Sequence, residues 1–184
     1  MNENEVVRLR AIVTQYTDLK KIAYIFDKAK VQWGIAAGSA YFIYSGDESG
    51  NDGDIDIWVD QEDKEKVAKL LKIDWTAKSS ERHRAENIEM GNFDIFTNCL
   101  KINNGKQVLD YRWTDEVTKH LRKETIGGGK YNIISPEDVA LLKIANPRSE
   151  TEKMQADRLL ASADEDYLKL RKKECGYINA DSFL

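Results

Sequence analysis

The stretch that decides the fold is residues 33–60, WGIAAGSAYFIYSGDESGNDGDIDIWVD. Its pattern predicts a short strand, a turn at Gly38-Ser39, a helix, a glycine-rich loop, and a second strand that begins at Asp54. Because side chains alternate between the two faces of a strand, Asp54 and Asp56 point the same way, and the apolar residues between them point into a core. Two neighbouring carboxylates repel each other, so this pattern indicates a cation between them.

The Gly38-Ser39 pair has its own chemical meaning. Gly38 lets the chain turn tightly and lets another group approach the backbone closely. We expect Ser39 to cap the helix that follows, and the N–H groups at the start of a helix attract anions such as phosphate. A Gly-Ser turn is common in proteins, so this pair gains weight only from the acids that follow it.

A third aspartate, Asp94, lies inside an apolar segment. Residues 84–90 and 93–98 flank a Gly-Asn pair, which predicts a hairpin whose second arm carries Asp94. An aspartate inside a strand is disfavoured unless it has a partner. Asp94 is therefore either an edge-strand residue that faces water or a partner of the first two aspartates.

The rest of the chain divides into an N-terminal part with strands and a C-terminal part rich in helix signals. We expect an irregular connection over 99–113, with a turn at Asn103-Asn104-Gly105. Apolar spacing and capping residues predict further elements: helices at 5–29, 61–71 and 114–121, helices that open at Ser135, Ser149 and Ser162, strands at 32–37 and 73–77, and a hairpin over 124–133.

Length and composition bound the class of protein. The 184 residues, 41% of them hydrophobic, are enough for one domain, or for one core with a helical annex. The formal net charge of −4 favours a small acceptor over a long nucleic acid, which basic proteins bind more often. No apolar run approaches the roughly 20 residues of a membrane helix, and no signal sequence is evident. Cys99 and Cys175 form no metal pattern, so we expect reduced thiols in a cytoplasmic protein.

The order of these features resembles the polymerase-β-type nucleotidyltransferase superfamily: Gly-Ser, a short helix, Asp-x-Asp, and a third carboxylate on a neighbouring strand. The resemblance covers roughly residues 30–100, and more weakly the helical tail. Within the superfamily, the sequence looks most like small stand-alone members, namely lincosamide and aminoglycoside nucleotidyltransferases and toxins of abortive-infection systems. One departure is the loop at residues 46–53, which makes the spacing before Asp54 slightly long.

The resemblance implies an α+β fold, with a mixed sheet flanked by helices and a helical C-terminal segment. We expect residues 1–113 to form the nucleotidyltransferase core with its N-terminal helix, and residues 114–184 to form a mainly helical segment that packs on it. It also implies that Asp54, Asp56 and Asp94 are catalytic and bind Mg²⁺ or Mn²⁺. Asp94 is then the third carboxylate rather than a residue facing water. The positions matched to nucleotide phosphates are Gly38, Ser39 and Lys143.

Five further charged residues stay open as contributors to the site. Arg82 and His83 either bind phosphate or acceptor, or belong to a polar loop that leads into a strand. Arg148, Lys153 and Asp157 match charged positions of the family and are otherwise ordinary charged residues of the helical tail.

The function implied is metal-dependent transfer of a nucleoside monophosphate from a nucleoside triphosphate to a hydroxyl of a small-molecule acceptor. Two alternatives remain. One is a toxin-like enzyme that modifies tRNA or protein. The other is a non-catalytic relative that binds nucleotide or only a partner chain. No membrane partner is expected.

Overall fold

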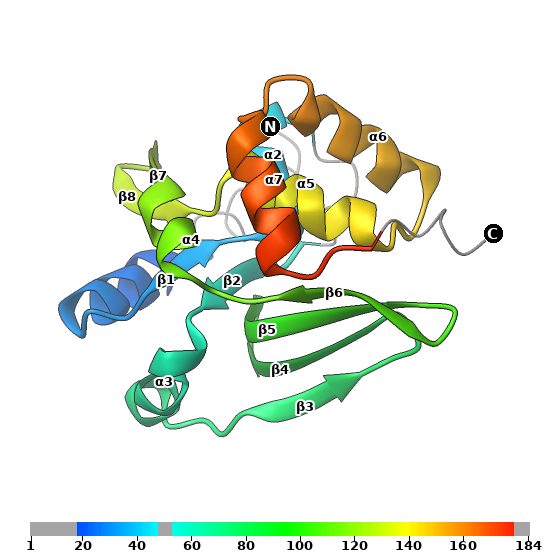
Figure 1. Cartoon of the computed structure of the whole chain (residues 1–184). Coiled ribbons are helices and arrows are strands. Elements are labelled where there is room, and N and C mark those ends of the chain that lie inside the picture. The colour runs from blue at the N-terminus through cyan, green and yellow to red at the C-terminus, as the bar shows by residue number, and fades with distance from the viewer. Residues whose placement is uncertain (1–17, 48–52, 179–184) are drawn as a thin grey trace, which may run out of the picture.

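A computed structural model describes residues 18–47 and 53–178, which form a mixed sheet covered by helices (Figure 1). Residues 18–28 are helical. The helices are α2 (Ala37–Ser45), η1 (Gln61–Asp63, a 3₁₀ turn), α3 (Lys64–Leu71), α4 (Asp115–His120), α5 (Pro136–Ala145), α6 (Glu150–Leu160) and α7 (Glu165–Glu174). The strands are β1 (Trp33–Ile35), β2 (Ile55–Val59), β3 (Thr76–Ser79), β4 (His83–Met90), β5 (Phe93–Asn103), β6 (Lys106–Tyr111), β7 (Arg122–Ile126) and β8 (Gly129–Ile133).

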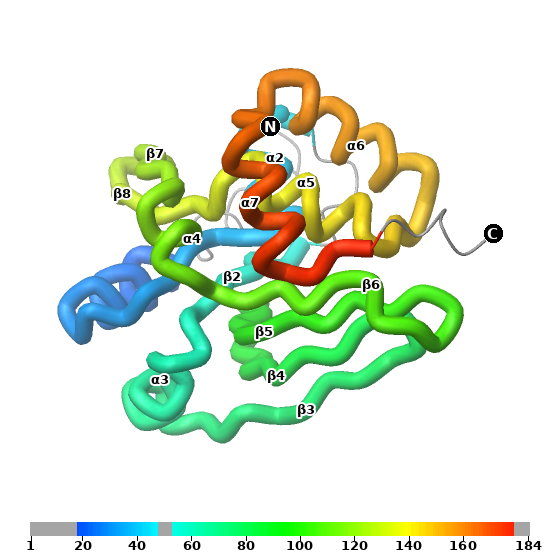
Figure 2. Tube along the Cα trace, viewed as in Figure 1, coloured from blue at the N-terminus to red at the C-terminus, as the bar shows by residue number. Residues whose placement is uncertain are grey.

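The sheet has eight strands in the order β3-β4-β5-β2-β1-β8-β7, and β6 also pairs with β5. Two pairs are parallel, β1 with β8 and β2 with β5, and the other pairs are antiparallel. The long strand β5 has β4 along one edge, while β2 and then β6 pair with successive parts of it (Figure 2). The predicted α+β class with a mixed sheet and flanking helices is confirmed.

Helix α5 is the centre of the helical layer, and α2, α6 and α7 pack against it (Figure 1). All of its residues except Ile144 are buried. Its start follows the sequence signal closely, because Ser135 accepts a hydrogen bond from the backbone N–H of Asp138, and Pro136 occupies the first turn. A helix this buried can carry polar side chains only where each has a partner inside the protein.

The main buried charge on α5, Asp138, has a full set of partners. Arg171 on α7 donates from Nε to Asp138 Oδ1 at 2.8 Å, and both side chains are 0% exposed. Tyr167 and Ser135 donate their hydroxyls to Asp138 Oδ2 at 2.6 and 3.0 Å. These contacts join α7 to α5 and fix the C-terminal helices on the sheet.

Several details differ from the sequence predictions. The irregular connection expected over 99–113 is wrong, because β5 continues to Asn103 and β6 returns beside it. The turn at Asn104-Gly105 is confirmed, and positive φ at both residues makes it a tight hairpin turn rather than a loop. The last helix is capped by Asp164, not by Ser162.

The other predicted elements occur with shifted bounds. The strand expected at 73–77 is β3, at Thr76–Ser79, and the hairpin expected over 124–133 is formed by β7 and β8. Of the helix expected over 5–29, residues 18–28 are confirmed, and the earlier part lies outside the described residues.

The division at residue 113 stays a prediction. The β7–β8 hairpin lies after that point and belongs to the same sheet, through the pairing of β8 with β1. Within the described ranges, none of the helices combines the length and the apolar character needed to cross a bilayer.

Candidate active site

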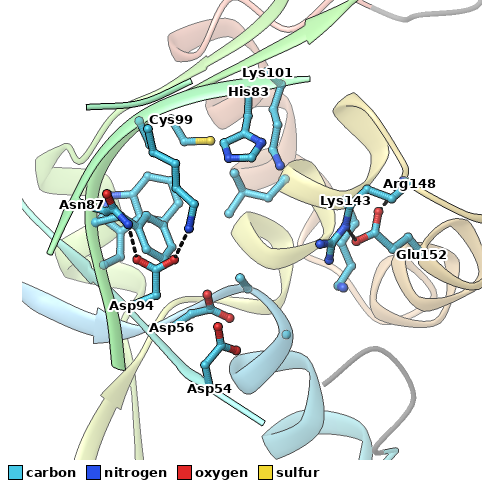
Figure 3. Close-up of a pocket in the computed structure, with 17 residues that line it drawn as sticks. Asp54, Asp56, His83, Asn87, Asp94, Cys99, Lys101, Lys143, Arg148 and Glu152 are labelled. Atoms are coloured by element: carbon cyan, nitrogen blue, oxygen red, sulfur yellow. Dashed lines mark hydrogen bonds and ion pairs between the residues drawn. The ribbon is translucent and has the colours of Figure 1, made fainter. Parts of the chain in front are cut away.

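Three aspartates converge at one end of a cavity that lies between the sheet and the α5–α6 corner (Figure 3). Asp56 on β2 lies directly beside Asp94 on β5, since the two strands are parallel and these residues are in register. One carboxylate oxygen from each of Asp54, Asp56 and Asp94 lies within 4.8 Å of the other two. The parallel register of β2 and β5 thus brings Asp94 to the two acids that strand alternation predicted to share a face. The edge-strand interpretation of Asp94 does not hold, because β5 is paired on both sides.

Ser39 fixes the start of the acidic strand. Its hydroxyl donates to the carbonyl oxygen of Asp54 and accepts from the backbone N–H of Asp56, both at 3.1 Å. The prediction that Ser39 caps α2 is wrong, because the N-cap residue is Ala36 and no side chain caps it. The left-handed residue at this turn is Ala37, with φ of 45°, rather than Gly38. Such a conformation is costly for a residue with a side chain, so the turn carries local strain beside the cavity.

Two donors hold the third acid in place. Asn87 on β4 donates from Nδ2 to Asp94 Oδ1 at 2.9 Å, and Lys78 on β3 donates from Nζ to Asp94 Oδ2 at 3.0 Å. Burial lowers the pKa of Lys78, but its hydrogen bonds to Asp94 and Glu89 outweigh that effect, and the net pKa is raised. Lys78 therefore stays charged and neutralises part of the acidic cluster.

The cavity has a volume of about 300 Å³, and its walls come from distant parts of the chain. Ala37 and Gly38 bring the start of α2 to it, and Lys143 brings α5. Lys143 donates to Gln155 Oε1 at 2.7 Å and lies over the ring of Tyr41. Burial is the main reason that the pKa of Lys143 is lowered. The lining residues are Ala37, Gly38, Asp54, Asp56, Trp58, Lys78, His83, Ala85, Asn87, Asp94, Phe96, Cys99, Lys101, Leu142, Lys143, Arg148 and Glu152.

No protein-family model and no curated protein matches this sequence. Solved structures do match it. The antibiotic-resistance factor ANT(2'')-Ia superposes with a TM-score of 0.53 at 14% identity, over 88% of this chain and 91% of the other. The same factor in complex with adenylyl-2''-tobramycin gives 0.53 at 15%, over 88% and 96%. TM1012 of Thermotoga maritima, a candidate nucleotidyltransferase, gives 0.50 at 22%, over 88% and 95%.

The chain has a polymerase-β-like nucleotidyltransferase fold. At these identities the likeness establishes the fold alone. What the site does must therefore be argued from its own residues.

Within this nucleotidyltransferase fold, the donor set at the acidic end suits a divalent cation. The candidate ligands are carboxylate oxygens, which Mg²⁺ and Mn²⁺ prefer, and the three side chains come within reach of a common point. All three are half-buried, so mutual repulsion is only partly screened by water. The residues present thus fit a metal site of the kind predicted from the sequence.

The five charged residues left open by the sequence fall into two groups. His83 and Arg148 line the cavity. Arg82 instead lines a second cavity of about 510 Å³, Lys153 forms a surface ion pair with Glu150, and Asp157 is exposed on α6.

Sequence reasoning missed four polar residues of the site, namely Lys78, Asn87, Lys101 and Glu152. A signal existed for Asn87, because it lies on the strand that pairs with Asp94 in the predicted hairpin. Glu152 holds Arg148 by a 2.7 Å contact to its Nε. The positions of Lys78 and Lys101 depend on strand registers that the sequence does not reveal.

The surroundings of His83 favour the neutral form of its imidazole. Burial lowers its pKa, and the positive charges of Lys101, Lys78 and Arg148 lower it further. Its Nδ1 lies 3.1 Å from the hydroxyl of Ser80, which orients the ring. A neutral imidazole can donate or accept a hydrogen bond at its other nitrogen.

Proposed function

We propose that this protein transfers a nucleotidyl group from a nucleoside triphosphate to a hydroxyl of a small-molecule acceptor. The observation that carries the proposal is the convergence of Asp54, Asp56 and Asp94 within 4.8 Å at one end of a cavity. Three mutually repelling carboxylates lower stability, whereas nucleotidyl transfer requires negative charge of this kind to hold cations against a triphosphate. The fold supports the same conclusion.

Asp54, Asp56 and Asp94 would hold Mg²⁺ or Mn²⁺. Once bound, such ions neutralise the phosphate charge and favour in-line displacement at the α-phosphorus. Asp94 would also accept the proton of the acceptor hydroxyl, while the acceptor oxygen forms its bond to the α-phosphorus and pyrophosphate departs. Lys78 and Asn87 keep the Asp94 carboxylate oriented for both tasks.

The triphosphate would lie between the acids and the start of α2. Gly38 lines this side of the cavity, and backbone N–H groups at a helix start attract phosphate. Lys143 faces the same space from α5 and would contact the phosphates. We assign Ser39 to positioning, because its hydroxyl is engaged with β2, and a direct contact between Ser39 and phosphate stays a prediction.

Thermal melting with Mg²⁺, with each nucleoside triphosphate, and with both tests this proposal. We expect a rise only when both are present, corresponding to about 2.7 kcal/mol at a ligand concentration of 100 Kd. EDTA should remove the rise. Incubation of the protein with α-labelled triphosphates and a cell extract should then move the label into the small-molecule fraction.

Each alternative function predicts a different result. Label in the tRNA or protein fraction would indicate a toxin-like enzyme. Absence of any melting shift with every triphosphate would favour a non-catalytic relative.

A further inference from the structure

The residues of β5 that line the cavity are not evenly spaced along the strand. Asp94 and Phe96 line the cavity with the spacing of two that a regular strand gives, and Cys99 and Lys101 line it after a step of three. The extra residue is accommodated at Asn98, which has a φ of 40°, and the pairing with β4 shifts there, between Ala85 and Glu86 on the partner strand. This is a β-bulge. Without it, Lys101 would point to the opposite face of the sheet from Asp94.

Lys101 has no hydrogen bond and no ion pair with any residue in the described ranges, although it is half-buried on the cavity wall. The other lysines of the wall are engaged, Lys78 with Asp94 and Lys143 with Gln155. The bulge therefore delivers a positive charge without an ion-pair partner to the cavity wall, and an anion would pair with it.

The residues around Lys101 also favour an anion. Lys101 lies directly across from His83 on β4, on the same face of the sheet. Arg148 faces the cavity from the α5–α6 side, beside Glu152, and contributes to the positive field at His83, while Glu152 offsets part of its charge. Figure 3 shows His83 and Lys101 at the end of the cavity away from Asp54 and Asp56. The cavity is thus acidic at one end and basic at the other.

The basic end lies on a different wall of the cavity from the place assigned to the triphosphate. Asp94 pairs with Glu89 and Lys101 pairs with His83, so the two positions are six residues apart along β4. Gly38 and Lys143, which would contact the phosphates, come from α2 and α5 instead. Phosphate oxygens bound to Mg²⁺ stay about 2.1 Å from the ion and therefore near the carboxylates. The basic end is then left for the other substrate.

We propose that the end of the cavity formed by Lys101, His83 and Arg148 is an anion-binding subsite for the acceptor. The acceptor is a small molecule that carries a hydroxyl at one end and a phosphate or carboxylate group at the other. This inference rests on the proposed function. It distinguishes the protein from an enzyme for a polycationic antibiotic, because such a molecule would meet an unpaired lysine and an arginine there.

Nuclear magnetic resonance with inorganic phosphate as the probe tests the subsite directly, in EDTA and without nucleotide. We expect saturable shifts at the amides of His83 and Lys101. Lys101→Ala should weaken phosphate binding there about tenfold or more, because a charge-assisted contact is lost. Lys101→Arg should largely retain it, and Lys123→Ala, at an exposed position on β7, should leave it unchanged. The subsite is refuted if these amides do not respond, or if they respond equally in Lys101→Ala.

Acceptor labelling then separates the possible sources of the anion. Matched pairs such as ribose and ribose 5-phosphate, or glycerol and glycerol 3-phosphate, are compared with tobramycin and with tRNA, using α-labelled triphosphates. We expect the phosphorylated member of a pair to be labelled faster, and Lys101→Ala to reduce kcat/KM for it about tenfold while sparing the neutral member. Preferential labelling of neutral or cationic acceptors, or of tRNA, overturns the inference and leaves nucleotidyl transfer standing. Loss of the melting shift with triphosphate would overturn the proposed function instead, and the phosphate titration does not depend on it.

Discussion

The buried Asp138 and the three aspartates at the cavity differ in how their negative charges are balanced. Asp138 on α5 is completely buried, and Arg171, Tyr167 and Ser135 satisfy it. The acids at the cavity, by contrast, have carboxylate oxygens within 4.8 Å of one another, and Asp94 forms an ion pair with Lys78. A buried charge that is fully paired keeps the fold together. A cluster that repels itself lowers stability and is maintained only because it does something else. The comparison separates structural acids from functional ones.

Removing the arginine from the structural pair should have the largest effect. Arg171→Ala leaves Asp138 buried and without its cation, so we expect the free energy of unfolding to fall by about 3–5 kcal/mol. Urea denaturation measures this. Arg158→Ala is the matched control, because Arg158 pairs with Asp47 at the surface with its side chain 57% exposed, and such pairs contribute at most about 1 kcal/mol. Equal losses in the two variants would remove the distinction.

Neutralising one acid of the cavity should show the opposite pattern. Asp56→Asn keeps the shape of the side chain and relieves repulsion, so stability in EDTA should be unchanged or higher. Transfer activity should fall about 10³-fold, because several kcal/mol of charge stabilisation are lost at about 1.36 kcal/mol per tenfold. Denaturation and label transfer on the same preparation give both numbers. Normal turnover, or a marked loss of stability, would contradict the assignment.

A smaller loss of activity should follow when an acid is kept but a hydrogen bond that orients it is removed. Asn87→Ala deletes the neutral donor to Asp94 Oδ1 and should lower activity about 10–100-fold, since partners of metal ligands orient them. Thr97→Ala deletes a comparable, partly buried hydrogen bond from Thr97 to Gln61, and Thr97 does not line the cavity. Both variants should lose about 1–3 kcal/mol of stability, and only the first should lose activity. A similar drop in turnover for both would mean that Asn87 acts through stability alone.

The sequence predicted the part of the site that depends on simple periodicity. Asp54 and Asp56 share a face because strand side chains alternate, and Asp94 was identifiable as an acid between apolar neighbours. The capping serines Ser135 and Ser149 predicted where α5 and α6 begin, and both cap as expected. Local rules of this kind require only neighbouring residues, so one sequence is enough to apply them.

What depends on irregular or long-range pairing was not predictable. The bulge at Asn98 changes which residues of β5 face the cavity, and no pattern in the sequence predicts that bulge. Lys78 reaches Asp94 across β4, a contact between strands that are not neighbours in the sheet. Ser39 bonds the backbone of β2 instead of capping its own helix, a choice that only the packed structure decides.

The register step at Asn98 has a consequence for how such sites diversify. In the proposed acceptor subsite, the charge depends on strand length as well as on residue type, because removing one residue between Phe96 and Cys99 would turn Lys101 to the opposite face of the sheet. Deletion of a single residue there would therefore change the preferred acceptor from anionic to neutral although no side chain is substituted. A comparison of sequences that counts only substitutions would miss this change.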